Sequence, residues 1–412
     1  MTPVPTLSLT RSSPSLRTLA AGTALALASV TTPAHAQERL GATRSLSGSL
    51  MFESWGFGDG LVQTTLRGDT IRLTRASRLS LPIGAEMRFG ERWLLGISAA
   101  LVNGRVSLDT ADAALRVDEY ALNGITDVKL TLTAQVIPDR VLVTLGLNAP
   151  PGGTSLDADE LEAVRVFAAP GLGFEVPSLG LGRAATAGVV VAHEMAGWAW
   201  ALGASYEMRS GSTPLVVTSG LPALDFNPSD AVHLTVGAEG LVGTHAMTAG
   251  LSVDLFSDDE YSSSDRPITG ARTRLGPIFT AEWQLRLSAF GLRELTVYAT
   301  ERYRSKYSRA GNSVSESSAN YVDLGVNGVA PLSPDLGIVG GVSLRHQTGI
   351  RADSSVASAA ARAAAVTLGV RYDLGGYWVQ PFVRGQVARL DTRRATADAK
   401  EFVGGVTLTT RF

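Results

Sequence analysis

The feature that most constrains the fold of this chain is a repeated pattern of long segments in which apolar and polar residues alternate. From about Leu46 to Phe412, segments of roughly 10 to 15 residues with a period of two are separated by a short turn or by a longer polar stretch. Successive side chains of a strand point to opposite faces, so each segment predicts a β-strand with one apolar and one polar face.

The alternation is clearest in the segments Leu122–Val136, Met247–Leu255 and Phe279–Ala289. In the first, one face carries Val128, Leu130, Leu132, Ala134 and Val136, and the other carries Asn123, Asp127, Lys129, Thr131, Thr133 and Gln135. Membrane-spanning strands need about 9 to 11 residues, whereas strands of soluble proteins average about 5 to 6. The length of the segments therefore favours an antiparallel transmembrane β-barrel over a soluble sandwich.

The connections between segments alternate in length. Short links fall at 90–92, 138–139, 195–197, 242–244, 291–292, 332–335 and 375–376, and longer ones at 108–119, 149–183, 210–229, 257–274, 306–318, 349–361 and 391–398. Short periplasmic turns and long external loops are typical of outer-membrane barrels. The segments predict an all-β, up-and-down barrel of about sixteen strands, with fourteen as the alternative.

Several aromatic residues stand beside the predicted short turns. Trp93, Trp198, Tyr377 and Trp378 each open a segment, as expected of an aromatic girdle at a membrane interface. A buried position in a β-core is the other interpretation.

The two ends of the chain predict export and assembly. Arg11 and Arg17 precede an apolar stretch, and Ala34-His35-Ala36 matches the small-x-small cleavage pattern, so residues 1–36 are expected to be a cleaved signal peptide. Residues 37–45 are then a short periplasmic segment or a small plug, and residues 46–412 form the barrel. The last strand alternates and stops on Phe412, which resembles the terminal assembly signal of outer-membrane barrels, with Thr410 where an aromatic residue is common.

Composition excludes several kinds of site. The chain has no Cys, so disulfides, thiol catalysis, Cys metal sites and a lipid-modified Cys are excluded. Removing the signal peptide removes two Arg and no acid, which moves the formal net charge from −2 to −4 and gives no indication of nucleic-acid binding. We expect no cofactor, and we expect outer-membrane lipid, the barrel assembly machinery and a small-molecule solute as partners.

If the apolar face contacts lipid, the polar face lines the lumen. The candidate lumen residues are Arg72, Arg78, Glu86, Arg88, Asp127, Lys129, His233, Glu239, Asp254, Glu282, Arg286, Arg302, Arg304, Asp323, Arg345 and Arg371. A water-filled pore, a salt-bridged plug and a closed, solvated interior all fit this set. The alternative to a functional role is a structural one, in which these charges only pair with one another between neighbouring strands.

The predicted loop 149–183 differs from the others. Ser155 or Asp157 can cap a short amphipathic helix that has acids in its first turn, and an apolar segment rich in Pro and Gly follows at 168–182. Such an apolar loop is expected to fold over or into the barrel mouth, as part of a ligand site or as packing of the rim. Pro82 and Pro381 interrupt predicted strands and are expected to mark bulges or gaps in the wall, or harmless irregularities.

Three stretches of the sequence carry a resemblance to a known family. Residues 123–130 read NGITDVKL, residues 145–153 read LGLNAPPGG, and residues 226–230 read FNPSD. They resemble elements of outer-membrane transporters grouped with the phenol-degradation meta-pathway family and, more distantly, with long-chain fatty acid transporters. The chain departs from the pattern at Pro151 and Ser229, where the group has Thr and Gly. The resemblance implies passive uptake of small, often hydrophobic or aromatic compounds, and it carries over no catalytic residues.

Two other classes of function remain open. A structural or adhesive barrel is the main alternative, because Ser-rich stretches at 261–265 and 312–318 are compatible with exposed loops. A barrel enzyme would need a nucleophile supported by His and an acid. Only His193, His233, His245 and His346 follow the predicted cleavage site, with no tight Ser/His/acid motif and no two His at metal-ligand spacing, so we predict neither catalysis nor a metal site.

Overall fold

The computed structural model describes residues 44–65, 70–109, 118–151, 156–169, 172–174, 182–215, 224–262, 272–287, 291–314, 317–348, 358–392 and 396–411. The predicted signal peptide, residues 37–43 and Phe412, with its predicted assembly role, lie outside these ranges. No helix within the described ranges is both long enough and apolar enough to cross a membrane.

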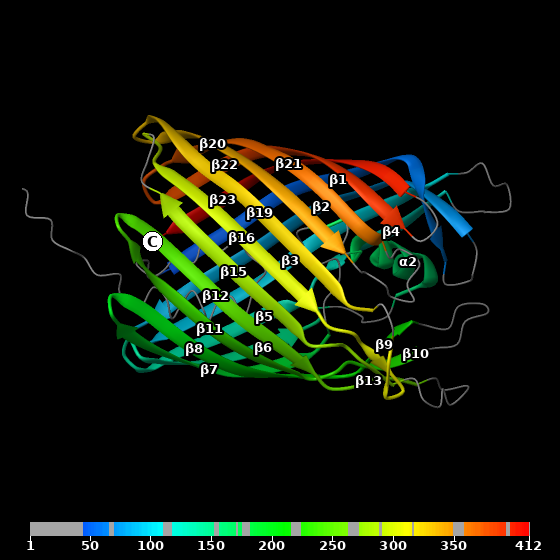
Figure 1. The fold of residues 1–412 in the computed structure, drawn as a ribbon, viewed down its shortest axis with the longest axis horizontal. Coiled ribbons are helices and arrows are strands. Elements are labelled where there is room, and N and C mark those ends of the chain that lie inside the picture. The colour runs from blue at the N-terminus through cyan, green and yellow to red at the C-terminus, as the bar shows by residue number, and fades with distance from the viewer. Residues whose placement is uncertain are drawn as a thin grey trace, which may run out of the picture.

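The main sheet closes on itself as a barrel (Figure 1). Its strands in chain order are β1 (Arg44–Thr64), β2 (Thr70–Phe89), β3 (Trp93–Leu108), β4 (Glu119–Ile125), β5 (Val128–Ile137), β6 (Val141–Ala149), β7 (Ala184–Met195), β8 (Trp198–Arg209), β11 (Ala231–Val242), β12 (His245–Phe256), β15 (Ile278–Leu287), β16 (Glu294–Arg304), β19 (Ala319–Ser333), β20 (Leu336–Thr348), β21 (Ser358–Asp373), β22 (Tyr377–Thr392) and β23 (Thr396–Arg411). Neighbours pair antiparallel, and β1 pairs with β23 to close the sheet. Because β4 and β5 follow one another along β3, they share one position, and the barrel has 16 strands as predicted.

The two ends of the barrel differ, as the alternation of connection lengths predicts. The short turns lie at the end that carries the C-terminus, and the helix α2 (Ala158–Phe167) lies at the opposite end (Figure 1). Loop segments at that end also form a small second sheet, whose strands pair in the order β9 (Ser212–Leu215), β10 (Leu224–Asn227), β13 (Asp259–Ser262), β14 (Arg272–Arg274), β17 (Ser308–Arg309) and β18 (Asn312–Ser313). We refer to this end as the loop end.

The alternation separates the two faces of the barrel wall. On β1, Leu50 and Phe52 are exposed, whereas Met51, Glu53 and Trp55 between and beyond them are buried. The same pattern places large exposed apolar residues on the outer face of every strand from β5 to β8, for example Leu145 and Leu202. An apolar outer face around a closed sheet leaves no unpaired backbone edge in lipid, which is the condition for a membrane-spanning barrel.

Two irregularities invert the alternation. The register of β2 against β3 shifts between Leu73 and Arg75, so the buried residues are Leu73 before the shift and Ala76 and Arg78 after it. The predicted strand 122–136 is in fact two strands, because Thr126 and Asp127 form an irregular break between β4 and β5. A bulge adds one residue to one strand and exchanges the faces beyond it.

The aromatic residues at the turns divide into two groups. Trp93 and Tyr377 are 49% and 45% exposed beside short turns, as expected of an interfacial girdle. The prediction is wrong for Trp378, which is only 5% exposed and lies under the guanidinium of Arg371, 5.1 Å from the ring centroid. Trp378 follows Tyr377 directly in the strand, and successive side chains point to opposite faces, so Trp378 lies on the inner face.

Neither predicted bulge occurs at the prolines. The β1–β2 register is the same on both sides of Pro82, but the pairing stops at Gly48 and resumes at Met51. The β21–β22 pairing likewise skips Pro381, which still pairs with Val406 on its other side. Because Pro has no backbone N–H, each ring interrupts one ladder without changing the register.

Candidate functional site

The loop between β6 and β7 begins with a well-capped helix. The backbone N–H of Glu160 donates to the Asp157 carboxylate at 2.7 Å, and the Asp157 N–H donates to the Glu160 carboxylate at 3.0 Å. This reciprocal capping box satisfies two N–H groups that α2 cannot pair internally. Of the two N-caps that the sequence allows, the structure uses Asp157.

The helix packs against the inner faces of β3 and β4. Ala163, Val166 and Phe167 are buried in a cluster that includes Val106 of β3 and Leu122 of β4. Phe167 occupies the space over Gly104, where an added Cβ would lie 2.5 Å from a ring carbon. The loop therefore enters the barrel, and Gly104 is the residue that leaves room for it.

The described part of the loop beyond α2 crosses the lumen. Phe174 lies edge-on to Phe167, with 5.1 Å between ring centroids, and the Arg78 guanidinium lies 4.6 Å from the Phe174 centroid. Gly173 adopts a φ of 61° and lies directly against Arg345 of β20. Four strands separate β2 from β20 around the barrel, so the loop bridges two parts of the wall. We call residues 156–174 the inner loop.

Arginines and their partners line the wall from β19 to β23. Arg345 lies 3.6 Å from Asp323 and 5.5 Å from the ring centroid of Tyr321, and the Tyr321 hydroxyl donates to Asp323. Arg384 reaches both carboxylate oxygens of Glu401 at 3.3 Å. Of these two pairs, Arg345–Asp323 joins two predicted residues on neighbouring strands, as the interpretation of cross-strand pairing expects, whereas Arg384 and Glu401 were not predicted.

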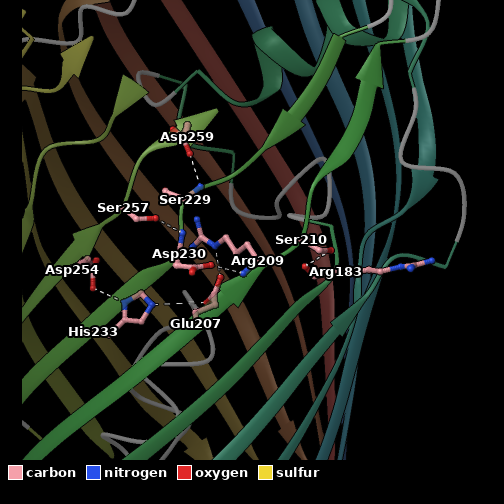
Figure 2. Close-up of polar contacts among 10 residues, drawn as sticks. All are labelled: Arg183, Glu207, Arg209, Ser210, Ser229, Asp230, His233, Asp254, Ser257 and Asp259. Carbon is pink, nitrogen blue, oxygen red and sulfur yellow. Dashed lines mark hydrogen bonds and ion pairs between the residues drawn. The ribbon is translucent and has the colours of Figure 1, made fainter. Parts of the chain in front are cut away.

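A second cluster lies at the loop end of β8, β11 and β12 (Figure 2). His233 lies 2.8 Å from Asp254 through Nδ1 and 3.9 Å from Glu207 through Nε2. The Arg209 side chain pairs with Glu207, and its backbone N–H donates to Asp230 at 3.0 Å. Above them, the backbone N–H groups of Ser229 and Asp230 donate to Asp259 and to Ser257, respectively. Ser229 and Asp230 of the FNPSD motif thus connect neighbouring segments at the rim of the barrel.

The other predicted lumen residues fall at several depths of the same inner face. Glu239 is 6% exposed, Glu86 accepts from the Ser45 hydroxyl, and Glu282 and Arg302 are exposed. The remaining ones are half-buried or lie at the break: Arg88, Lys129, Arg286 and Arg304 in strands, and the buried Asp127 between β4 and β5. Their role in lining a solute path stays a prediction.

Arg72 is placed differently from the prediction. It lies before the register shift of β2, and its neighbours Ile71 and Leu73 are buried while its own side chain is 53% exposed. Its guanidinium donates to the backbone carbonyl of Asp59. The shift moves Arg72 to the outer face, opposite to Arg78.

Several inner residues were missed in the sequence. Glu53, Glu207, Arg384 and Glu401 all occupy the inner face. Each alternates with an exposed apolar neighbour, such as Phe52 beside Glu53. The alternation with a period of two could therefore have assigned these residues to the inner face. The contacts of the inner loop had no such local signal.

The described residues contain no group of three or more His, Asp or Glu side chains placed to hold a metal ion. A cavity of about 430 Å³ lies at the loop-end sheet, where Asp258, Arg272 and Arg274 are among its lining residues. The ion pairs Arg272–Glu260 and Arg274–Asp258 connect the strands there.

The closed antiparallel sheet, its apolar outer face and its polar, partly bridged interior define a transmembrane β-barrel of the bacterial outer membrane. Neither a protein family nor a curated protein matches the sequence. Solved structures that it resembles include OprB of Pseudomonas putida at high pH (11% identity, 90% of this chain, 94% of that chain, TM-score 0.49). A deltaS2S3 mutant of the TodX monoaromatic hydrocarbon channel is also similar (10% identity, 90% of this chain, 91% of that chain, TM-score 0.43). So is a Pseudomonas aeruginosa FadL homologue (10% identity, 90% of this chain, 90% of that chain, TM-score 0.40). The class of protein is assigned from the closure of the sheet and the distribution of its side chains, and the assignment does not rest on these similar structures.

Proposed function

We propose that this barrel mediates passive transport of small, hydrophobic or aromatic compounds across the outer membrane. The observation that supports this most directly is the position of the inner loop, which brings Leu172, Phe167 and Phe174 inside the barrel mouth next to Arg78. Arg78, Phe167 and Leu172 are buried beneath the half-buried Phe174, so the Phe174 ring is the apolar surface of this group that an aromatic ligand can pack on.

A lateral exit into the membrane suits a hydrophobic ligand better than release into water. The ladder interruptions at Pro82 and Pro381 lie on either side of the β23–β1 seam, since Pro381 pairs with Val406 and Val406 pairs with Leu50. Fewer hydrogen bonds resist separation of the strands there. These two positions are the candidate exits.

A water-filled diffusion pore is the second candidate. Glu282 and Arg302 lie on the inner face and are exposed, and solvated charges in a lumen favour passage of polar solutes. We do not propose catalysis. A structural or adhesive role for the loop-end sheet remains the alternative outside transport.

Single-channel conductance of the purified mature protein in a planar bilayer separates the two transport versions. Stable open steps from folded protein would support the diffusion pore. Folded protein without conductance, together with quenching of tryptophan fluorescence by a small aromatic hydrocarbon, would support the ligand-binding version. A Phe174→Ala variant should weaken that quenching, whereas Phe279→Ala, which removes an exposed ring from the outer wall, should not. Absence of both conductance and binding would contradict transport.

A further inference from the structure

The outer wall of the barrel is not uniform at the loop end. In the described strands, the outward-facing Lys and Arg residues of this half of the wall are confined to β21, β22, β23, β2 and β3. They are Arg72, Arg75, Arg105, Arg362, Arg389 and Lys400, and we call them the basic patch. The corresponding part of the opposite wall carries exposed Tyr206, Phe279 and Tyr303.

The centre of the basic patch is a strip without side chains. Lys400 of β23 pairs with Gly56 of β1, and Gly56 pairs with Arg75 of β2, so the two cations flank a glycine in one row. Strands lie about 4.8 Å apart, which puts the two flanking Cα atoms about 10 Å apart. Gly58, two residues further along β1, occupies the same outer face. A Cβ added at Gly56 would meet nothing within 4 Å, so the strip is an open floor between two long cationic side chains.

Three of the six cations of the basic patch form no ion pair with a described residue. Arg75 donates to the Ser54 hydroxyl at 3.0 Å, and the described residues offer no ion pair to Arg75, Arg362 or Lys400. The other three cations of the basic patch form loose ion pairs with exposed acids. These are Arg72–Asp109 at 4.0 Å, Arg105–Glu119 at 3.9 Å and Arg389–Asp391 at 3.8 Å. Exposed pairs at such distances contribute little stability, and they leave the guanidinium donors available.

The depth of the basic patch identifies the anion. It lies on the lipid-facing side of the wall, at the end with the long external loops, which is the level of the headgroups of the outer leaflet. The outer leaflet of this membrane consists of glycolipid that carries phosphate groups on its sugars. We propose that the basic patch binds the phosphorylated headgroup of that glycolipid, with one phosphate held between Arg75 and Lys400 and the sugar lying over Gly56 and Gly58.

The test is a titration of the purified full-length mature protein in detergent micelles with bisphosphorylated lipid A, read by native mass spectrometry as bound lipid per barrel. The double variant Arg75→Gln/Lys400→Gln should bind about ten- to thirtyfold more weakly, as expected for the loss of two interfacial cations. Lys129→Gln/Arg302→Gln removes the same charge from the inner face and serves as the matched control.

Equal loss in the control would mean that net charge alone attracts the lipid, and no loss in the patch variant would mean that the phosphates bind elsewhere; either result overturns the proposal. A second variant, Gly56→Leu, keeps every charge but fills the floor of the strip. It should also weaken binding, and unchanged binding by folded Gly56→Leu contradicts the placement of the sugar. A lipid A analogue without phosphates should bind the parent chain, the double variant of the basic patch and the inner-face control alike. None of these outcomes depends on transport.

Discussion

Arg78 on β2 donates two hydrogen bonds to a single carboxylate oxygen of Glu53 on β1, at 3.1 Å from Nε and 2.7 Å from Nη2, and neither side chain reaches solvent. The same guanidinium lies under Phe174 of the inner loop. A buried ion pair thus forms the floor on which the inner loop rests, and it connects the wall of the barrel to the segment that narrows the mouth.

Removing one member of this pair should be more costly than removing both. Arg78→Met leaves the Glu53 carboxylate buried without the Arg78 guanidinium, and we expect a loss of about 3 to 5 kcal/mol in the free energy of unfolding. The double variant Arg78→Met/Glu53→Leu should recover a large part of that loss. Urea unfolding in micelles, followed by tryptophan fluorescence, measures both. Additive losses in the double variant would show that the two side chains are not energetically coupled.

Gly104 should control the position of the inner loop. A Cβ at this position collides with the Phe167 ring, so Gly104→Ala should displace the loop from the wall and change conductance or ligand quenching. The double variant Gly104→Ala/Phe167→Leu should restore the behaviour of the parent chain. Gly250 on β12, where an added Cβ would meet only a backbone oxygen at 3.8 Å, provides the control substitution Gly250→Ala. Identical changes in both glycine variants would contradict this assignment.

The capping box should stabilise the inner loop from its N-terminal side. Asp157→Ala removes the acceptor for the Glu160 N–H, and loss of such a cap costs about 1 kcal/mol. We expect faster amide exchange in α2 while the barrel strands keep their protection, measured by hydrogen–deuterium exchange. Asp157→Ser, which retains a capping oxygen, should behave like the parent chain. Exchange that is equally fast in the serine variant would show that capping does not limit the opening of α2.

The rim contact at Asp230 should weaken in acid. The hydrogen bond from the Tyr206 hydroxyl, followed by that from the Arg209 backbone N–H, lowers the pKa of Asp230 below its usual value. A lowered pKa in the folded state gives stability that is complete above the pKa of an unfolded Asp, about 3.9, and that is lost as the pH falls through the folded value. Asp230→Asn should therefore lower the thermal midpoint slightly at pH 7, and the difference should shrink below about pH 4.

Asp335→Asn, in a short turn at the other end of the barrel, is the matched control for this pH dependence. A difference between Asp230→Asn and the parent chain that stays constant from pH 7 to pH 3 would show that the charge of Asp230 does not stabilise the rim.

The sequence by itself determined the class of fold and most of the wall. The period of two identified strands such as Met247–Leu255, and the alternation of short and long connections predicted the number of strands and the separation of short turns from long loops at opposite ends, because both properties are local. It also predicted the helix of the inner loop, since Asp157 is a possible N-cap and acids follow it in the first turn.

The tertiary structure decided which residues meet. Arg72 and Arg78 have the same parity in the sequence, but the register shift between Leu73 and Arg75 puts them on opposite faces. The burial of Glu53, the contact of Gly104 with Phe167 and the crossing of Gly173 to Arg345 depend on closure of the barrel around the inner loop. Alternation constrains each strand only along its own length, whereas faces beyond a bulge and contacts across a lumen are set by pairing between strands that are distant in the chain.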